Sequence, residues 1–531
     1  MAIIFIFGAG IVAKLFFIQV VKDDFYKALV QGQSLYNLGE KIENARGEIF
    51  FKGGEPLAIN VEWPLVSLSP SEVQNRETVA KDLALALNLD EALILEKLDA
   101  ENLYVILKKR LTDEEVGRIK ELNLKGVYLQ KEAGRYYPQE TLASQLVGFL
   151  NAEKDGQYGL EEYYDSVLSG NRKNPGEDIT LAVDYPVQFM AEKLLKEAKD
   201  NLKIEGGDII VMNPTTGEIL AMANYPSFDP NEYSKVTDLD VFKNSATQNI
   251  FEPGSIFKPI TMAGAVDMGV ITPQTTYQDP GTIKIGKWSI YNYLNRIYPG
   301  NITMTEVLEK SINTGAVFAK DRLGNENFLR YVGDFGVFEP TGIDLEETYS
   351  RNEELKKGYE INFATASFGQ GIEITPIQLV KAFSAIINGG DLIAPRIVAK
   401  IGEEETGREV TRENVISDKT TSQLAAMLVS VIEKGYGKPA RIQGYYMGGK
   451  TGTAQVSFAA LGIDKIGYSE KTWQSFIGFA PAFNPQFVIL VKIDNPQTKT
   501  AEFSAVPIFK ELAKYIIDYY QIPPDYDDTT E

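Results

Sequence analysis

The sequence predicts an α+β chain with two folded parts behind an apolar N-terminal segment. Residues 2–21 form the one apolar run of membrane length. Residues 22–177 carry helix and strand patterns, and residues 178–520 carry strand patterns at both ends with helices between them. This order predicts a mixed second domain rather than a repeated parallel βαβ unit. Residues 521–531 are acidic and are predicted to be a disordered tail.

Composition excludes several kinds of active site. The 531 residues include no histidine and no cysteine, which removes Ser-His-Asp triads, cysteine nucleophiles and disulfides. Any nucleophile is then Ser, Thr, Lys, Tyr or a carboxylate, and a serine activated by lysine becomes the leading option. The net charge of −20 argues against binding to nucleic acid. We predict no cofactor and no metal site.

The apolar run at 2–21, AIIFIFGAGIVAKLFFIQVV, is interpreted as a transmembrane signal-anchor that is retained. Lys14 interrupts the run, but a lysine side chain can extend towards the headgroups. The alternative is a buried amphipathic helix. With the anchor in place, the rest of the chain is expected outside the cell membrane.

Residues 22–177 are interpreted as a structural or docking module, because no polar cluster there has a catalytic pattern. The glycine pair at 53–54 predicts a hairpin turn between two strands. Helical patterns cover about 80–99 and 112–122, and residues 134–138 are predicted to be a loop.

The second domain is expected to begin at residue 178 and to contain paired strands at each end. Apolar runs at 208–212 and 218–222 flank a Pro/Gly turn, which predicts a hairpin. The other predicted elements are a strand at 178–181, a helix at 186–201, a strand pair at 472–480 and 486–493, and a closing helix at 501–520.

The central motif of this domain is Gly254-Ser255-Ile256-Phe257-Lys258-Pro259. A helix beginning near Ser255 would place Lys258 on the same face one turn later, beside the hydroxyl. A proline in the first turn is compatible with that helix, since its missing amide has no intrahelical partner there. The pair predicts a nucleophile with an adjacent base, although an isolated Ser-x-x-Lys is more often an exposed helix face.

Two further polar clusters follow. Ser311 and Asn313 lie in a predicted helical stretch, 303–321, where both are poor helix formers. Lys450, Thr451, Gly452 and Thr453 continue a predicted strand, and its glycines would let a ligand backbone approach closely. Taken alone, the first cluster is explained by a local turn or a helix end and the second by a bulge or by packing.

Together the three clusters resemble the signature of the penicilloyl serine transferases, Ser-x-x-Lys, Ser-x-Asn and Lys-Thr-Gly. Ser311 follows Ser255 by 56 residues and Lys450 follows it by 195, which is compatible with that fold. Other stretches are similar to the class B penicillin-binding proteins, particularly the division-type (septal) members: Arg46-Gly47, Gly134-Arg135-Tyr136-Tyr137-Pro138, Pro253-Gly254-Ser255, Ser367-Phe368-Gly369-Gln370-Gly371, Asn388-Gly389-Gly390 and Ser475-Phe476-Ile477-Gly478-Phe479-Ala480-Pro481. The sequence departs from the class at Phe51 and Lys52, usually Asp-Arg, and at Ser245, usually Arg.

This resemblance implies a transpeptidase domain, mainly an antiparallel sheet flanked by helices, on an elongated pedestal or dimerisation-like domain. It implies that Ser255 attacks the bond between two D-alanines of a peptidoglycan stem peptide, with Lys258 as base and Ser311 as proton relay. Asn313 would hold the substrate amide, and Lys450, Thr451 and Thr453 would receive its carboxylate. The backbone amides of Ser255 and Thr453 would form the oxyanion hole, beside Gly452.

The implied partners are stem peptides, β-lactams, a membrane glycan polymerase and proteins of the division complex. Alternatives remain: an elongation-type transpeptidase, a D,D-carboxypeptidase, a β-lactamase, or a non-catalytic scaffold or β-lactam sensor. The N-terminal module argues against a β-lactamase. The intact lysines and serine argue against a scaffold.

Overall fold

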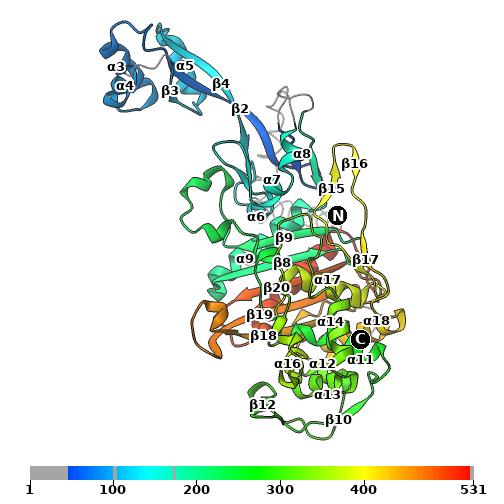
Figure 1. Ribbon diagram of the computed structural model, residues 1–531. Coiled ribbons are helices and arrows are strands. Elements are labelled where there is room, and N and C mark those ends of the chain that lie inside the picture. The colour runs from blue at the N-terminus through cyan, green and yellow to red at the C-terminus, as the bar shows by residue number, and fades with distance from the viewer. Residues whose placement is uncertain (1–45, 100–103, 171–174, 527–531) are drawn as a thin grey trace, which may run out of the picture.

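The computed structural model describes residues 46–99, 104–170 and 175–526. It has two parts, an N-terminal domain that extends away from a larger C-terminal domain (Figure 1). The predicted anchor at 2–21 lies outside the described residues. Within the described part of the chain, no helix is both long and apolar enough to cross a membrane.

The N-terminal domain, which we call the pedestal, is organised around a long two-stranded arm. Strand β2 (Pro56–Leu68) pairs antiparallel with β4 (Val127–Tyr136) along ten residues, from Leu68–Val127 to Ile59–Tyr136. At the far end, three helices and β3 pack into a small separate core. These elements are α3 (Arg76–Leu87), α4 (Glu91–Asp99), β3 (Val105–Lys108) and α5 (Asp113–Leu122). Figure 1 shows this end farthest from the C-terminal domain.

Two sequence predictions in the pedestal are wrong in detail. The helix expected over 80–99 is two helices, because Asn88 adopts a left-handed backbone (φ 51°) that ends α3. The loop expected at 134–138 is the end of β4 as far as Tyr136. Long-range pairing with β2 sets this strand, and that pairing is not visible in the local sequence. The hairpin at Gly53-Gly54 joins β1 (Ile49–Phe50) to β2, as expected.

A buried ion cluster fixes the base of the arm. The Glu161 carboxylate accepts from Arg46 Nε and from Arg135 Nε, each at 2.7 Å. Arg135 also donates to the carbonyl of Gly47 at 2.8 Å. Such buried charges are tolerated only when paired and hydrogen-bonded, as here. The cluster ties β4 to the start of the domain and to α7 (Gly159–Tyr163).

The C-terminal domain is centred on a five-stranded antiparallel sheet, in the order β18-β19-β20-β8-β9. Its strands are β8 (Gly206–Met212), β9 (Ile219–Tyr225), β18 (Gly448–Ser457), β19 (Tyr468–Ala480) and β20 (Phe487–Asp494). All of β8 is buried, in agreement with the apolar run over its second half, and its one charged residue, Asp208, is paired with Lys492. The α+β class and the hairpins expected at both ends of the domain are confirmed.

Helices cover both faces of this sheet. Helices α9 (Tyr185–Leu202) and α19 (Ala505–Tyr519) pack on one face around Ile209, Val211 and Phe476. The other face packs against α11 (Lys258–Asp267), α17 (Pro376–Ile387) and α18 (Asp418–Lys434) around Ile210, Met212 and Ile477. The two apolar layers hold the sheet between them, and the larger layer supports the site described below.

The remaining elements of the C-terminal domain surround this larger layer. They are β7 (Ile179–Leu181), α10 (Ser245–Gln248), β10 (Thr276–Gln278), β11 (Thr282–Ile285), β12 (Trp288–Tyr291), β13 (Asn301–Thr303), α12 (Met304–Glu309), α13 (Asn313–Leu323), α14 (Asn325–Asp334), α15 (Glu353–Lys356), α16 (Glu360–Ala366), β14 (Leu392–Ile393), β15 (Val398–Ile401), β16 (Glu404–Glu405) and β17 (Val410–Arg412). In the pedestal, α6 (Ser144–Val147), β5 (Phe149–Leu150), β6 (Gly156–Gln157) and α8 (Asp165–Ser169) complete the set.

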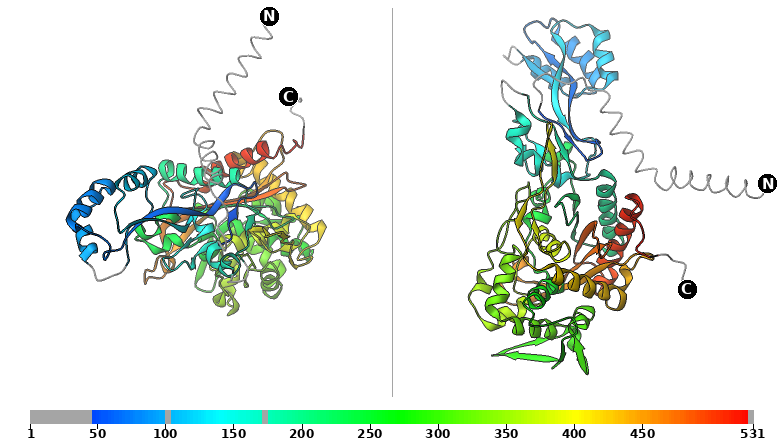
Figure 2. Two further views of the ribbon diagram at one scale, coloured as in Figure 1. Left: turned by 90° about the horizontal axis from the view of Figure 1, so that it is seen from above. Right: turned by 90° about the vertical axis from the view of Figure 1, so that its right-hand side faces the viewer.

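A mixed sheet joins the two domains. Strand β1 of the pedestal pairs in parallel with β7, and β7 pairs with β15 from the second half of the chain. Tyr164 of the pedestal also donates to the Asp344 carboxylate at 3.3 Å, and that carboxylate accepts from the amides of Ile397 and Val398. Figure 2 shows the pedestal standing at one end of the C-terminal domain.

The acidic C-terminal segment differs in part from the disordered tail expected over 521–531. Residues 521–526 pack against the segment before β18, where Tyr445 donates to the carbonyl of Ile522 at 2.7 Å. The Asp525 carboxylate accepts from the amide of Tyr446 at 2.8 Å. Residues 527–531 lie outside the described part of the chain.

Candidate active site

Ser255 lies on a tight turn that leads into α11. Residues Gly254–Phe257 form a 3₁₀ turn, and the α-helix starts only at Lys258, so the helix expected from Ser255 begins one turn later. Residues three apart still face each other in a 3₁₀ turn. Gly254 has φ 58°, and a Cβ there would lie 3.0 Å from the Cβ of Ala454, so glycine lets this turn approach β18.

The Lys258 side chain is fully buried and surrounded by oxygen atoms. Its Nζ lies 2.7 Å from the carbonyl of Ser311, 2.8 Å from Oδ1 of Asn313, 3.0 Å from Oγ of Ser255 and 3.2 Å from Oγ of Ser311. Burial and the nearby Lys450 lower the pKa of Lys258 well below its usual value. A neutral amine is therefore favoured at this position.

A neutral amine has two N–H donors and one lone pair. The Ser311 carbonyl and Asn313 Oδ1 are acceptors only, so they take the two donors of Lys258. The lone pair is then left for a hydroxyl that can donate, and two lie within reach, Ser255 at 3.0 Å and Ser311 at 3.2 Å. The surroundings of Lys258 thus leave it able to accept the proton of Ser255.

Ser311 owes its position to a break between two helices. Helix α12 ends at Glu309 and α13 begins at Asn313, so the continuous helix expected over 303–321 is wrong. Ser311 itself has φ 53°, in the left-handed region. This conformation turns the Ser311 carbonyl towards Lys258, while its hydroxyl lies between Lys258 and Lys450.

The orientation of the Asn313 amide is set by a residue that the sequence did not indicate. Nδ2 of Asn313 donates to the backbone carbonyl of Tyr291 at 2.9 Å, so Oδ1 faces Lys258. Tyr291 ends β12, and its contribution is a main-chain atom. No side-chain motif could have predicted it.

Strand β18 brings the third cluster to the same place. Lys450 Nζ donates to Ser311 Oγ at 2.9 Å and to the carbonyl of Thr451 at 3.0 Å. Burial lowers the pKa of Lys450 to about 7. Gly452 has no room for a side chain, since a Cβ would lie 2.5 Å from Ser475 Oγ. Thr453 Oγ1 accepts from the amide of Ala501 at 3.2 Å, which leaves its own O–H free to donate.

The electrostatics of the site are those of a pocket for an anion. Among the residues that the structure describes, no carboxylate lies within ion-pair distance of Lys258 or Lys450. In its protonated form Lys450 has no counter-ion among the described residues, which favours a ligand that brings its own negative charge. In the same described ranges no group of acidic side chains is arranged to hold a metal ion.

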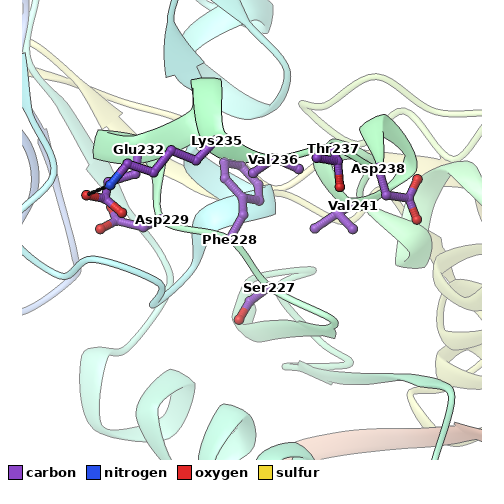
Figure 3. Close-up of a pocket in the computed structure, with 9 residues that line it drawn as sticks. All are labelled: Ser227, Phe228, Asp229, Glu232, Lys235, Val236, Thr237, Asp238 and Val241. Atoms are coloured by element: carbon purple, nitrogen blue, oxygen red, sulfur yellow. Dashed lines mark hydrogen bonds and ion pairs between the residues drawn. The ribbon is translucent and has the colours of Figure 1, made fainter.

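One pocket on the C-terminal domain lies elsewhere. It has a volume of about 350 Å³ and is formed by the segment between β9 and α10 (Figure 3). Lys235 and Glu232 on its rim form an ion pair at 2.6 Å. None of the predicted catalytic residues lines this pocket.

Comparison with known families agrees with this geometry. Residues 207–514 match the penicillin-binding protein transpeptidase domain, and residues 41–175 match the penicillin-binding protein dimerisation domain. The chain belongs to this family. A dimerisation domain followed by a transpeptidase domain confirms the resemblance to class B that the motifs predicted.

Curated relatives and solved structures extend over most of the chain. Stage V sporulation protein D of Bacillus subtilis is 34% identical, over 89% of this chain and 78% of its own. A probable peptidoglycan D,D-transpeptidase of Pseudomonas aeruginosa is 29% identical, over 96% of this chain and 93% of its own length. The crystal structure of penicillin-binding protein 3 from Mycobacterium tuberculosis in complex with aztreonam has a TM-score of 0.69 at 25% identity, over 91% of this chain and 97% of that one.

The positions where the sequence departs from the family have local explanations. Phe51 is fully buried against the edge of the Tyr185 ring, and Lys52 lies 3.8 Å from Glu218 at the domain joint. Ser245 donates to the Asp208 carboxylate. Lys492 of the neighbouring strand β20 lies 3.1 Å from the Asp208 carboxylate and supplies a positive charge there.

Proposed function

We propose that this penicillin-binding protein is a serine-type peptidoglycan D,D-transpeptidase that works through a Ser255 acyl-enzyme. The observation that carries the proposal is the amine of Lys258, whose N–H groups face two acceptors and whose lone pair is left for Ser255. The family and the relatives named as D,D-transpeptidases support the same activity.

The first half-reaction follows from these positions. Lys258 accepts the Ser255 proton as Oγ attacks the carbonyl between two D-alanines, and the carboxylate of the terminal D-alanine lies near Lys450, Thr451 and Thr453. The backbone amides of Ser255 and Thr453 stabilise the oxyanion; loss of one such donor costs about 10²–10³ in rate. When the C–N bond breaks, the proton passes from Lys258 through Ser311 to the departing amine.

In the second half-reaction an amine from a neighbouring stem peptide attacks the ester. The new amide bond forms, its surplus proton is taken up by Lys258, and Ser255 Oγ recovers a proton as it leaves. β-Lactams acylate Ser255 in the same way.

We place this activity outside the cell membrane and in septal wall synthesis. This placement rests on the anchor predicted at 2–21 and on the resemblance to division-type members. A glycan polymerase and division proteins are the partners we expect.

Intact mass after incubation with benzylpenicillin tests the nucleophile. We expect one stable adduct on the wild type and none on Ser255→Ala. Absence of an adduct on folded wild type would contradict the assignment, and rapid loss of the adduct would indicate a β-lactamase.

Chromatography of the products formed from uncross-linked peptidoglycan tests the acceptor. Cross-linked dimers support transpeptidation, whereas released D-alanine without dimers would indicate a D,D-carboxypeptidase.

The septal assignment is tested by the position of a fluorescent fusion of this protein in the cell. An even distribution along the cell would contradict it.

A further inference from the structure

We propose that Asn292 is a positioning residue for the acylation step, because it holds the start of helix α13 and thereby fixes which way the Asn313 amide faces. This inference rests on the proposed function, in which the Asn313 amide contacts the amine of the base, Lys258. Asn292 follows β12, which lies beside α13 at the end of the molecule opposite the pedestal (Figure 1). It is only 3% exposed.

Helix α13 begins without a side-chain cap of its own. The residue before it is Ile312, whose apolar side chain cannot accept from the first amides of the helix. These amides have no partner within the helix, and a buried amide without an acceptor is costly. Oδ1 of Asn292 accepts from the amide of Thr314 at 3.1 Å, so the missing cap comes from another segment of the chain.

The Asn292 amide fits this place in one orientation. Its Nδ2 donates to the Asp279 carboxylate at 2.9 Å and to the carbonyl of Arg296 at 3.1 Å, and both partners accept. The backbone amide of Thr314 on the other side can only donate. Asn292 therefore joins three segments, which are the one before β11, the turn after β12 and the first turn of α13.

Asp279 completes the network at this junction. Its carboxylate accepts from the hydroxyl of Thr314 at 2.7 Å and from two backbone amides at 2.9 Å each. With the Asn292 amide, the carboxylate has four donors, which stabilise it in a partly buried position. Asp279 and Asn292 together hold the side chain and the backbone of Thr314, the residue that follows Asn313.

Two consecutive residues of one segment thus hold two consecutive residues of another. The carbonyl of Tyr291 accepts from Nδ2 of Asn313 at 2.9 Å, and the side chain of Asn292 accepts from the amide of Thr314 at 3.1 Å. The second contact fixes the register between the end of β12 and the start of α13. Without it, we expect the Tyr291 carbonyl to move out of hydrogen-bond range of Asn313.

The direction of the Asn313 amide matters for the base. Oδ1 lies 2.8 Å from the Lys258 amine and takes one of its N–H donors. A turned amide would present Nδ2 instead, which would donate to the lone pair of the neutral amine. That lone pair accepts the Ser255 proton in the proposed reaction. The Tyr291 carbonyl, held in place by Asn292, prevents the turn because it gives Nδ2 an acceptor on the side away from the base.

A double-mutant cycle between Asn292 and Asn313 tests the proposal. The rate of acylation by benzylpenicillin is measured for the wild type, for Asn292→Ala, for Asn313→Ala and for the double variant. We expect Asn292→Ala to slow acylation of the wild type by about tenfold to a hundredfold, the size of a positioning effect. In the Asn313→Ala background the same change should slow acylation by less than about twofold, because no amide is left to turn.

The pH dependence of the same rate gives a second readout. Burial and the facing charge of Lys450 hold the pKa of Lys258 well below its usual value. A turned Asn313 amide favours the neutral amine further, because Nδ2 repels the ammonium group and donates to the lone pair of the amine. The rising limb of the pH profile should therefore move to lower pH in Asn292→Ala. The falling limb should stay in place, since Lys450 is unchanged.

Asn388→Ala is the matched control. The Asn388 side chain also donates to two carbonyls, those of Pro214 and Asp391, and accepts from a backbone amide. None of these partners belongs to the site, so this variant should leave the rate and the rising limb unchanged. If Asn292→Ala does not fold, Asp279→Asn takes its place in the cycle, because it weakens the same network at a side chain of equal size. It should change the rate and the rising limb in the same direction.

An equal effect of Asn292→Ala with and without the Asn313 amide would overturn the proposal, since it would indicate a general loss of structure. A rising limb that does not move would overturn it as well, and so would an equal loss of rate in Asn388→Ala. Failure of the proposed function is recognised separately, because the wild type would then form no benzylpenicillin adduct at all.

Discussion

The Nζ of Lys258 lies 2.7 Å from the carbonyl oxygen of Ser311, the shortest of its four hydrogen-bond distances. A backbone carbonyl cannot donate, so this contact fixes one N–H of the lysine in either protonation state. Ser311 presents the carbonyl only because its φ is 53°. The conformation of one residue between two helices therefore helps to determine where the Lys258 amine directs its lone pair.

Replacing Lys258 separates charge from basicity. Lys258→Arg keeps a cation that does not lose its proton at neutral pH, and Lys258→Met keeps similar length without charge. We expect both to slow acylation by benzylpenicillin by about 10²–10⁴, because both lack a base. The acylation rate is measured by stopped flow, and urea unfolding checks that each variant is folded. An active Lys258→Arg protein would show that the residue is needed as a charge and not as a base.

The kcat/KM for acylation by a peptide substrate should show a bell-shaped dependence on pH. The rising limb reports loss of the proton from Lys258, whose pKa burial and Lys450 hold well below its usual value. The falling limb reports loss of the proton from Lys450, whose pKa burial lowers to about 7, since a neutral amine no longer attracts the substrate carboxylate. Acylation is therefore expected to decline above about pH 7.

A substrate without that carboxylate provides the control for the falling limb. A peptide ending in an amide should lose the decline above about pH 7 and keep the rising limb. Identical profiles for the acid and the amide would contradict the role of Lys450. Lys450→Met should also move the rising limb to higher pH, because the neighbouring positive charge is removed.

Ser311→Gly tests the hydroxyl of Ser311 without disturbing its turn. Glycine adopts φ 53° freely, so the carbonyl should still face Lys258 while the hydroxyl between the two lysines is lost. We expect turnover of a D-Ala-D-Ala peptide to fall by about 10²–10⁴ if this group relays the proton. Ser384→Ala, at a buried serine in α17 whose hydroxyl donates to the Val380 carbonyl, serves as the matched control. A decrease of equal size in both variants would point to stability rather than proton transfer.

The buried charges at Lys492 make a prediction about stability. Lys492 Nζ lies 3.1 Å from the Asp208 carboxylate and 2.7 Å from that of Asp494. Lys492→Met would leave two carboxylates without their cation, and removing one partner of a buried pair costs about 3–5 kcal/mol. We expect a loss of that size in the free energy of unfolding, measured with urea.

An exposed pair gives the comparison for Lys492. Lys471 lies 2.6 Å from Glu205, and both side chains are about half exposed. Lys471→Met should therefore cost about 0–1 kcal/mol. If the two variants lost the same stability, burial would not be the reason for the Lys492 effect.

The sequence itself determined the chemistry and the main architecture. A chain without histidine and cysteine leaves serine with lysine as the leading pair, and Ser255, Lys258, Ser311, Asn313 and Lys450 could be named from their motifs. The hairpins of β8–β9 and β19–β20 could also be predicted, because the alternation of apolar runs and turn residues is local.

The tertiary structure alone decided the geometry that makes these residues a site. The break at Ser311, the extension of β4 through Tyr136 and the carbonyl of Tyr291 at Asn313 depend on backbone angles and on hydrogen bonds between distant segments. Local propensity does not encode such contacts, since they form only when the sheet and helices pack together. The motifs therefore name the groups that we propose to react, and the packing of α11, α13 and β18 decides which atom of each faces the next.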